Sequence, residues 1–116
     1  MFVDDEIILD KVITKISKDI RDKYTIIRSA PYYLEFLHKD VNKGVGMSKV
    51  AEKLNISQEE VICMGDAEND LHMLQYAGLS IAMGNADDNI KNMADYVTLS
   101  NEEGGVAHAI RKFVLK

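Results

Sequence analysis

The sequence is poor in cysteine and proline, with one residue of each among its 116 residues, and it contains no long apolar run. The single cysteine, Cys63, lies within a short apolar stretch. This position indicates a small buried side chain rather than a disulfide partner, a nucleophile or a metal ligand. The longest apolar runs are far too short to span a bilayer, so we expect no membrane association.

Basic residues are scarce as well, with 14 Lys and Arg against 19 Asp and Glu and a net charge of −5. Binding to a phosphate backbone needs concentrated Lys and Arg, so we do not expect a nucleic-acid partner. Residues 1–3 lead directly into acidic residues, without the basic leader and long apolar region of a secretory signal, and we therefore expect a cytoplasmic protein. The length by itself predicts one domain with one core.

The first forty residues have the pattern of a small mixed α and β unit. Apolar spacing predicts a strand over residues 1–3, a helix over 6–22, and two strands over 24–29 and 32–37 that could pair antiparallel. The polar, glycine-bearing passage over residues 39–46 then predicts a hinge or domain boundary.

After this passage, helices and strands alternate. The pattern predicts helices over 45–54, 69–77, 88–94 and 105–114, and strands over 61–64, 79–83 and 96–99. The second of these helices is expected to end at Gly78, a residue that tolerates the left-handed conformation common at helix ends. Such alternation is typical of an α/β fold in which a parallel sheet carries helices on its faces.

Polar residues follow each of the three strands in this second part. Ligands of parallel sheets bind beyond the carboxyl ends of the strands, where the loops 65–69, 84–87 and 100–104 are expected to meet. We therefore expect Asp66, Asn69, Asp70 and Asn85 to lie near one another.

The segment GDAEND, residues 65–70, has the residue types of a magnesium site. Asp66 can present carboxylate oxygens to Mg²⁺, and Asp70, four residues on, can orient it or hold a metal-bound water. Asn69 can donate a hydrogen bond to a phosphate oxygen. The alternative is that these residues only cap a helix, a place where Asp and Asn are preferred.

Lys43 is the remaining candidate. A lysine beside glycine at the mouth of an α/β sheet can neutralise a phosphate and the carboxylates around it. The alternative is a solvated lysine on the surface of a hinge.

Taken together, these motifs resemble one enzyme family over nearly the whole chain. NKG at 42–44, GDAEND at 65–70, GLSIAMGNA at 78–86 and ADYVTLSNEEGGVAHAI at 94–110 are similar, in order and spacing, to the C-terminal portion of haloacid-dehalogenase-superfamily phosphatases. The Cof-type branch matches best, and SAPYYLEFLHKDVNKG makes the chain similar to its YidA-like sugar phosphatases.

The resemblance implies a role for each matching residue. It makes Lys43 the catalytic lysine, which also contacts the phosphate, Asp66 a ligand of a Mg²⁺ cofactor, Asn69 a contact of the substrate phosphate, and Asp70 a support of the metal site. It also replaces the single-domain expectation with pieces of two domains. Residues 1–40 resemble the end of an α+β cap domain, and residues 41–116 resemble the C-terminal part of a Rossmann-like core.

Two parts of the family pattern have no counterpart in these 116 residues. One is the Asp-x-Asp motif, whose first aspartate attacks phosphorus, and the other is the later Ser or Thr that binds the phosphoryl group. FVDDE, at 2–6, is no substitute, because adjacent aspartates on a strand point to opposite sides. We therefore expect a fragment of a phosphatase for small phosphomonoesters that is inactive alone. The alternative is a non-catalytic module that keeps a phosphate or cation pocket and forms a homodimer through exposed core edges.

Overall fold

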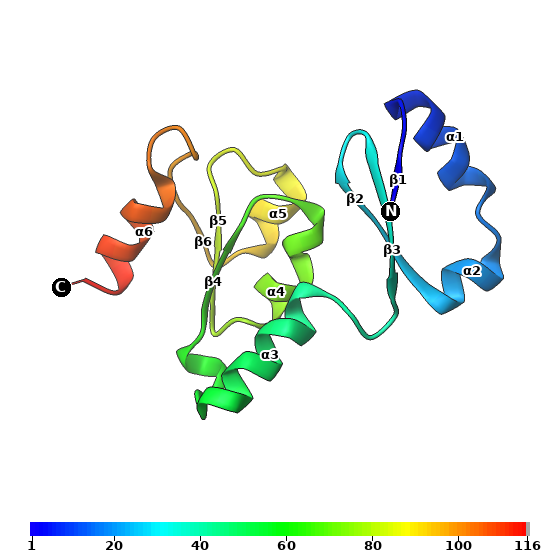
Figure 1. The fold of residues 1–116 in the computed structure, drawn as a ribbon. Helices are drawn as coiled ribbons and strands as arrows, with labels where there is room; N and C mark the ends of the chain where they lie inside the picture. Colours follow the sequence, from blue (N-terminus) through cyan, green and yellow to red (C-terminus); the bar gives the residue numbers. More distant parts are fainter. Residues whose placement is uncertain (116) are drawn as a thin grey trace. The chain divides into compact units, whose positions relative to one another are not determined.

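The structure is a computed structural model that describes residues 1–115 and separates into two compact units (Figure 1). The first unit spans Met1–Asn42, and the second begins at Lys43. Within residues 1–115, no helix combines the length and the apolar character that crossing a bilayer requires.

The first unit is a three-stranded antiparallel sheet with two helices. Its elements are β1 (Phe2–Val3), α1 (Glu6–Lys15), α2 (Lys18–Lys23), β2 (Tyr24–Ala30) and β3 (Tyr33–His38). The strand order is β1-β3-β2, with Ile26 opposite Phe36, so the predicted antiparallel pair is confirmed. Leu9 of α1 and Leu34 of β3 are the buried apolar residues of this unit.

The prediction of one helix over residues 6–22 is wrong, because the chain leaves the helical conformation at Ile16 and Ser17. Both residues are extended, as suits a β-branched side chain and a helix-capping serine. Arg21 donates hydrogen bonds to the carbonyl oxygens of Ile13 and Ile16, two groups that a continuous helix would have paired. The carbonyl groups at the break thus accept hydrogen bonds from a side chain of α2.

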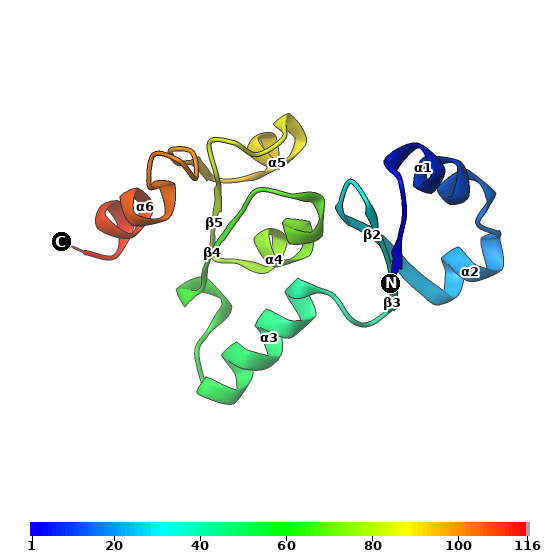
Figure 2. The ribbon, with the colours of Figure 1, turned by 45° about the horizontal axis from the view of Figure 1, so that its top comes forward.

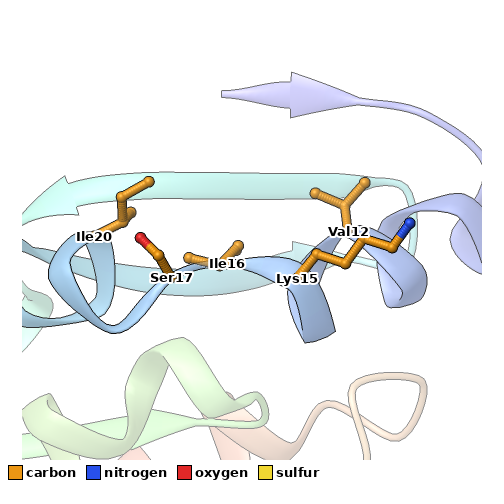
Figure 3. Close-up of a pocket in the computed structure, with 5 residues that line it drawn as sticks. All are labelled: Val12, Lys15, Ile16, Ser17 and Ile20. Atoms are coloured by element: carbon orange, nitrogen blue, oxygen red, sulfur yellow. The ribbon is translucent and has the colours of Figure 1, made fainter.

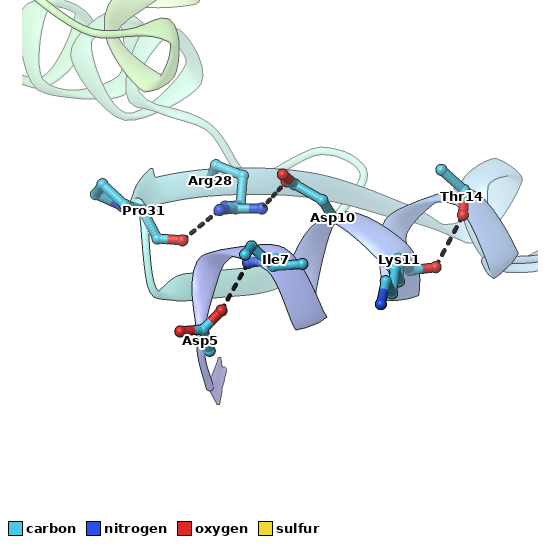
Figure 4. Close-up of polar contacts among 7 residues, drawn as sticks. All are labelled: Asp5, Ile7, Asp10, Lys11, Thr14, Arg28 and Pro31. Carbon is cyan, nitrogen blue, oxygen red and sulfur yellow. Dashed lines mark hydrogen bonds and ion pairs between the residues drawn. The ribbon is translucent and has the colours of Figure 1, made fainter.

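Polar contacts hold α1 against the sheet (Figure 4). The Nη1 atom of Arg28, on β2, lies 2.7 Å from Oδ1 of Asp10 on α1, and its Nη2 atom donates to the carbonyl of Pro31. Asp5 caps α1 by accepting a hydrogen bond from the Ile7 amide at 2.9 Å. Asp5 therefore has a local structural role at the N-terminus of α1.

The second unit is an α/β structure around a parallel sheet. Its elements are α3 (Lys43–Leu54), η1 (Gln58–Glu60), β4 (Ile62–Gly65), η2 (Glu68–Asp70), α4 (Leu71–Tyr76), β5 (Leu79–Ala82), α5 (Asp88–Met93), β6 (Tyr96–Val97) and α6 (Gly105–Phe113). The strand order is β4-β5-β6, and both pairs are parallel, which confirms the predicted fold class. Figures 1 and 2 show α6 on one side of this sheet and α4 and α5 on the other.

The core of this unit lies between the sheet and the helices α3, α4 and α5. Its buried members include Cys63, Leu74, Ala82 and Ile90. Cys63 is 2% exposed, and burial raises the pKa of its thiol, so the prediction of a small buried side chain is confirmed.

The boundary between the units, after Asn42, lies within the passage predicted as a hinge or domain boundary, and α3 begins at Lys43, two residues before its predicted start. Gly44 lets this helix pack closely against the backbone of His72 on α4. Gly78 is not left-handed, since Gly104 is the only glycine with positive φ among the described residues. A Cβ atom at Gly78 would instead lie 2.5 Å from the Glu59 carbonyl oxygen, so glycine is needed there for close approach.

Candidate functional site

The three parallel strands end at one edge, and backbone hydrogen bonds continue beyond them into the loops. The Met83 amide donates to the Gly65 carbonyl at 2.9 Å, the Thr98 amide to the Ala82 carbonyl at 2.9 Å, and the Gly84 amide to the Leu99 carbonyl at 3.0 Å. The loops after β4, β5 and β6 are therefore held side by side, as their place at the carboxyl edge predicts.

Asp70 is the buried acidic residue of this edge, with 6% of its surface exposed. Its Oδ2 atom accepts hydrogen bonds from the backbone amides of Asp66 at 3.0 Å and Ala67 at 3.3 Å, and its Oδ1 atom accepts one from Lys43. Gly65 makes this arrangement possible, because a Cβ atom there would lie 2.5 Å from the Cβ atom of Asp70. Asp70 thus caps the turn after β4, as the capping alternative proposes, and pairs with Lys43 as well.

Lys43 is the first residue of α3, and its Nζ atom forms an ion pair with Asp70. Its side chain is 49% exposed, against 8% for that of Asp70, so the ammonium group still faces solvent. Lys43 is thus partly solvated, as the alternative of a surface lysine states, but it is also paired with Asp70. Its partner Asp70 belongs to the same turn as Asp66.

Asp66 follows β4 directly and is exposed. Its Oδ2 atom accepts a hydrogen bond from Nδ2 of Asn85 at 3.0 Å, and Oδ1 of Asn85 accepts one from the Asn101 amide at 2.9 Å. Asp66 does not cap the turn, because its carboxylate is engaged by a residue of a different loop. The expected proximity of Asp66, Asp70 and Asn85 is therefore confirmed.

Asn69 lies in η2, one residue before Asp70, and is half-buried. Within residues 1–115, its side chain has no hydrogen bond, so its predicted contact with phosphate stays a prediction. The contribution of Asn101 escaped sequence reasoning, because it is made by a backbone amide. Only its place in the loop after the third strand could have indicated it.

The donor set is compatible with a cation held through one protein carboxylate. Magnesium in phosphate-handling sites takes one or two carboxylates and completes its coordination with water and substrate oxygens. Asp66 offers its Oδ1 atom, which accepts no hydrogen bond from the described residues, whereas both oxygens of Asp70 are engaged. Within residues 1–115 no group of three or more His, Cys, Asp or Glu side chains could hold a metal by itself.

Burial raises the pKa of the Asp70 carboxyl, but the hydrogen bonds from Lys43 and from the two amides together outweigh burial and lower the pKa below its ordinary value of 3.8. A group with a depressed folded-state pKa stabilises the fold above its unfolded pKa, and this stabilisation is lost as the pH falls through the folded value.

We therefore expect Asp70→Asn to lower the free energy of unfolding at pH 7, and the difference from wild type to shrink below about pH 4. Denaturant unfolding of both proteins at pH 7, 5, 4 and 3 measures this difference directly. A difference that does not change across this range would contradict the ionic role of Asp70.

A groove of about 370 Å³ lies elsewhere, in the first unit (Figure 3). It is lined by Val12, Lys15, Ile16, Ser17 and Ile20. Its walls contain neither a carboxylate nor an amide side chain, so it does not have the donors of the edge beyond β4, β5 and β6.

Comparison with known proteins identifies similar proteins over nearly the whole chain. A model of haloacid dehalogenase-like hydrolases matches residues 1–110. YxeH of Bacillus subtilis (strain 168) is 48% identical over 115 residues, which cover 99% of this chain and 43% of YxeH. The 5-amino-6-(5-phospho-D-ribitylamino)uracil phosphatase YcsE of the same organism is 42% identical over 113 residues, covering 97% of this chain and 45% of YcsE.

A solved structure agrees with these sequence relatives. The sugar phosphatase BT4131, described as HAD subclass IIB, superposes with a TM-score of 0.80 and 30% identity over 99% of this chain and 42% of BT4131. The chain therefore spans less than half the length of the relatives that it matches.

Proposed function

Since this chain belongs to the haloacid dehalogenase-like hydrolases, a family that includes phosphatases, we propose that it forms part of a Mg²⁺-dependent phosphatase acting on sugar phosphates or related small phosphomonoesters. The observation that carries the proposal is the linked set Lys43, Asp70, Asp66 and Asn85 at the carboxyl edge of the sheet. Two relatives are named for small phosphorylated substrates, which supports the substrate class.

The proposal gives a task to each of four residues at this edge. Asp66 binds the cation through its carboxylate, Lys43 neutralises charge on the substrate phosphate, and Asn69 donates a hydrogen bond to a phosphate oxygen. Asp70 holds Lys43 and the turn after β4 in place through its three hydrogen bonds. The bound Mg²⁺ supplies positive charge that draws phosphate oxygens to the site.

The proposal also assigns the two units. Residues 1–40 form the end of a cap domain, and residues 41–116 form the C-terminal part of the catalytic core. In the proposed reaction a carboxylate oxygen attacks phosphorus as the bond between phosphorus and the substrate alcohol oxygen breaks, which gives an aspartyl-phosphate and the protonated alcohol. Water then hydrolyses this acyl phosphate, which regenerates the carboxylate and releases inorganic phosphate. These 116 residues contain no Asp-x-Asp, so the attacking carboxylate comes from outside them.

We therefore expect the 116-residue chain to show no turnover above background with p-nitrophenyl phosphate or glucose 6-phosphate in millimolar Mg²⁺. Lys43, Asp66 and Asn69 hold charges and oxygens in place, but positioning without an attacking group does not complete the covalent step. A phosphate-release assay, with Asp66→Asn as the matched variant, measures this. Turnover that requires both Mg²⁺ and Asp66 would show that the nucleophile lies within these residues.

The reading frame upstream of Met1 gives the complementary test. An apolar strand followed by Asp-x-Asp in that frame would provide the nucleophile, and the longer protein is then expected to hydrolyse sugar phosphates in a reaction that depends on Asp66 and Lys43.

A non-catalytic, self-associating module remains the second reading. Strand β4 pairs only with β5 among the described strands, and Val50, Leu54 and Ile56 are exposed large apolar residues. A free strand edge and exposed apolar surface favour association between copies. A longer reading frame without Asp-x-Asp, together with a concentration-dependent dimer in sedimentation, would favour this reading.

A further inference from the structure

We infer that Asn85 is a positioning residue for the cation site, which it serves by holding the Asp66 carboxylate in a single orientation. This inference rests on the proposed function, because it concerns the carboxylate that we assign to the cation. It assigns a task to the loop after β5, to which the proposed mechanism gives none.

The two hydrogen bonds of Asn85 determine which way its amide points. The Asn101 backbone amide can only donate, and it lies 2.9 Å from Oδ1 of Asn85. The ionised Asp66 carboxylate can only accept, and its Oδ2 atom lies 3.0 Å from Nδ2 of Asn85. The Asn101 amide is therefore paired with the carbonyl oxygen of the Asn85 side chain, and the Asp66 carboxylate with its NH₂ group. A flipped side-chain amide would lose both hydrogen bonds.

The backbone that carries Asn85 is anchored on both sides. Met83 is 7% exposed and Ala86 is 5% exposed, and the Ala86 amide donates to the Met83 carbonyl at 2.9 Å. A Cβ atom at Gly84 would lie 2.7 Å from the Ser100 amide nitrogen, so this loop is pressed against the loop after β6. Asn85 thus extends an exposed polar side chain from a backbone fixed by the core.

The consequence for Asp66 follows from which oxygen is engaged. The side chain of Asp66 is exposed, and a free aspartate at such a position would sample several rotamers. Asn85 takes Oδ2, and Oδ1 accepts no hydrogen bond from the described residues. A carboxylate held in this way has one oxygen that can bind a cation. A partner that orients a metal-binding carboxylate typically contributes about 10–100-fold in metal affinity.

The test measures cation binding by the 116-residue chain, with no catalytic readout. Mn²⁺ binding is followed by paramagnetic line broadening of assigned amide signals near residue 66, and Mg²⁺ binding by chemical-shift titration. Asn85→Ala removes both hydrogen bonds, and Asn85→Leu removes them while keeping the bulk of the side chain. Both variants are expected to weaken Mn²⁺ and Mg²⁺ binding by about 10-fold, with amide signals far from the loops unchanged.

Asn101→Ala is the matched control, because it removes a side chain but keeps the backbone amide that holds Asn85. Its affinity for both ions is expected to equal that of wild type. The side-chain NH₂ signal of Asn85 gives a second readout, since it is expected to shift in Asp66→Asn and when Mg²⁺ is added to wild type.

The outcomes separate this inference from the proposed function. Wild-type affinity in both Asn85 variants, with binding lost in Asp66→Asn, would overturn the positioning role alone. Unchanged binding in Asp66→Asn, or no Mg²⁺ binding by wild type, would overturn the cation role of Asp66 and the positioning role with it. An Asn101→Ala variant as weak as Asn85→Ala would mean that general loop disruption causes the loss, and would also overturn the inference.

Discussion

Gly44→Ala is expected to lower the free energy of unfolding by about 2–3 kcal/mol, because it overpacks the contact between α3 and α4. A Cβ atom at Gly44 would lie 2.4 Å from the His72 carbonyl oxygen and 2.7 Å from its carbonyl carbon. These are backbone atoms, so no side-chain rotation can relieve the clash and the helices must separate. Denaturant unfolding of the variant measures the loss.

Gly46→Ala is the matched control for this prediction. It lies two residues further along the same helix, and a Cβ atom there would meet no atom within 4 Å. Alanine is the better helix former by up to about 1 kcal/mol, so this variant is expected to be as stable as wild type or more stable. Equal stability of the two variants would contradict the close approach of α3 to α4.

The clash at Gly44 also bears on the proposed site. Lys43 precedes Gly44 on α3, and Asp70 immediately precedes α4, so separating the two helices would draw the ion pair apart. We expect the amide signals of Asp66 and Ala67, which donate to Asp70, to shift in Gly44→Ala and to remain in place in Gly46→Ala.

Asp66→Asn is expected to weaken cation binding at least about 100-fold, which exceeds the effect of removing its supporting partner. Asparagine keeps the size of aspartate and an oxygen that can accept from Asn85, so the variant removes little besides the charge. Magnesium depends on charged oxygen ligands, and the described residues offer no group of three or more acidic, His or Cys side chains in place of Asp66. Mn²⁺ line broadening around residue 66 measures the loss.

Glu68→Gln is the control for Asp66→Asn, since it removes an exposed acidic charge two residues away. The local concentration of negative charge falls equally in both variants, so a purely electrostatic attraction of cations would weaken equally in both. We expect Glu68→Gln to bind Mn²⁺ about as tightly as wild type. Similar losses in the two variants would show that the ion is held by the general field and not by Asp66.

The order of elements was predictable because the local pattern and the tertiary fold agree over most of the chain. The strand before Asp66, the alternation after it and the antiparallel pair in the first unit all follow from apolar spacing. Ser57 and Glu60 form a capping box, a feature that depends only on residues three apart. Signals of this kind lie within one or two turns of chain and need no distant partner.

The errors occur where a distant contact overrides the local pattern. The apolar face over residues 6–22 does not reveal that Arg21 can satisfy the carbonyls of a break at Ile16. Glycine has a low intrinsic helix propensity, but the packing of α3 on the backbone of His72 requires glycine at position 44. Gly78 marks the end of α4, yet what demands glycine there is the carbonyl of Glu59.

The sequence by itself determined which residues could carry the chemistry. It made Asp66, Asn69 and Asp70 candidates by residue type and by their place after a parallel strand, because the carboxyl ends of such strands gather in one place. The role of Lys43 came from the family resemblance. It left the capping and functional readings of Asp70 both open. Residue type is the same in either case, so a local pattern cannot separate them.

Only the tertiary structure decided which carboxylate oxygens of these residues are engaged by other protein groups. Asp70 has both carboxylate oxygens engaged, by Lys43 and by two amides, whereas Asp66 has one oxygen engaged by Asn85. Lys43 lies 27 residues away from Asp70, and Asn85 lies 19 residues away from Asp66, whereas the two amides lie only four and three residues from Asp70. The direction of a side chain depends on such partners, and the distant ones, Lys43 and Asn85, come within hydrogen-bonding distance only once the helices and strands of the unit have packed together.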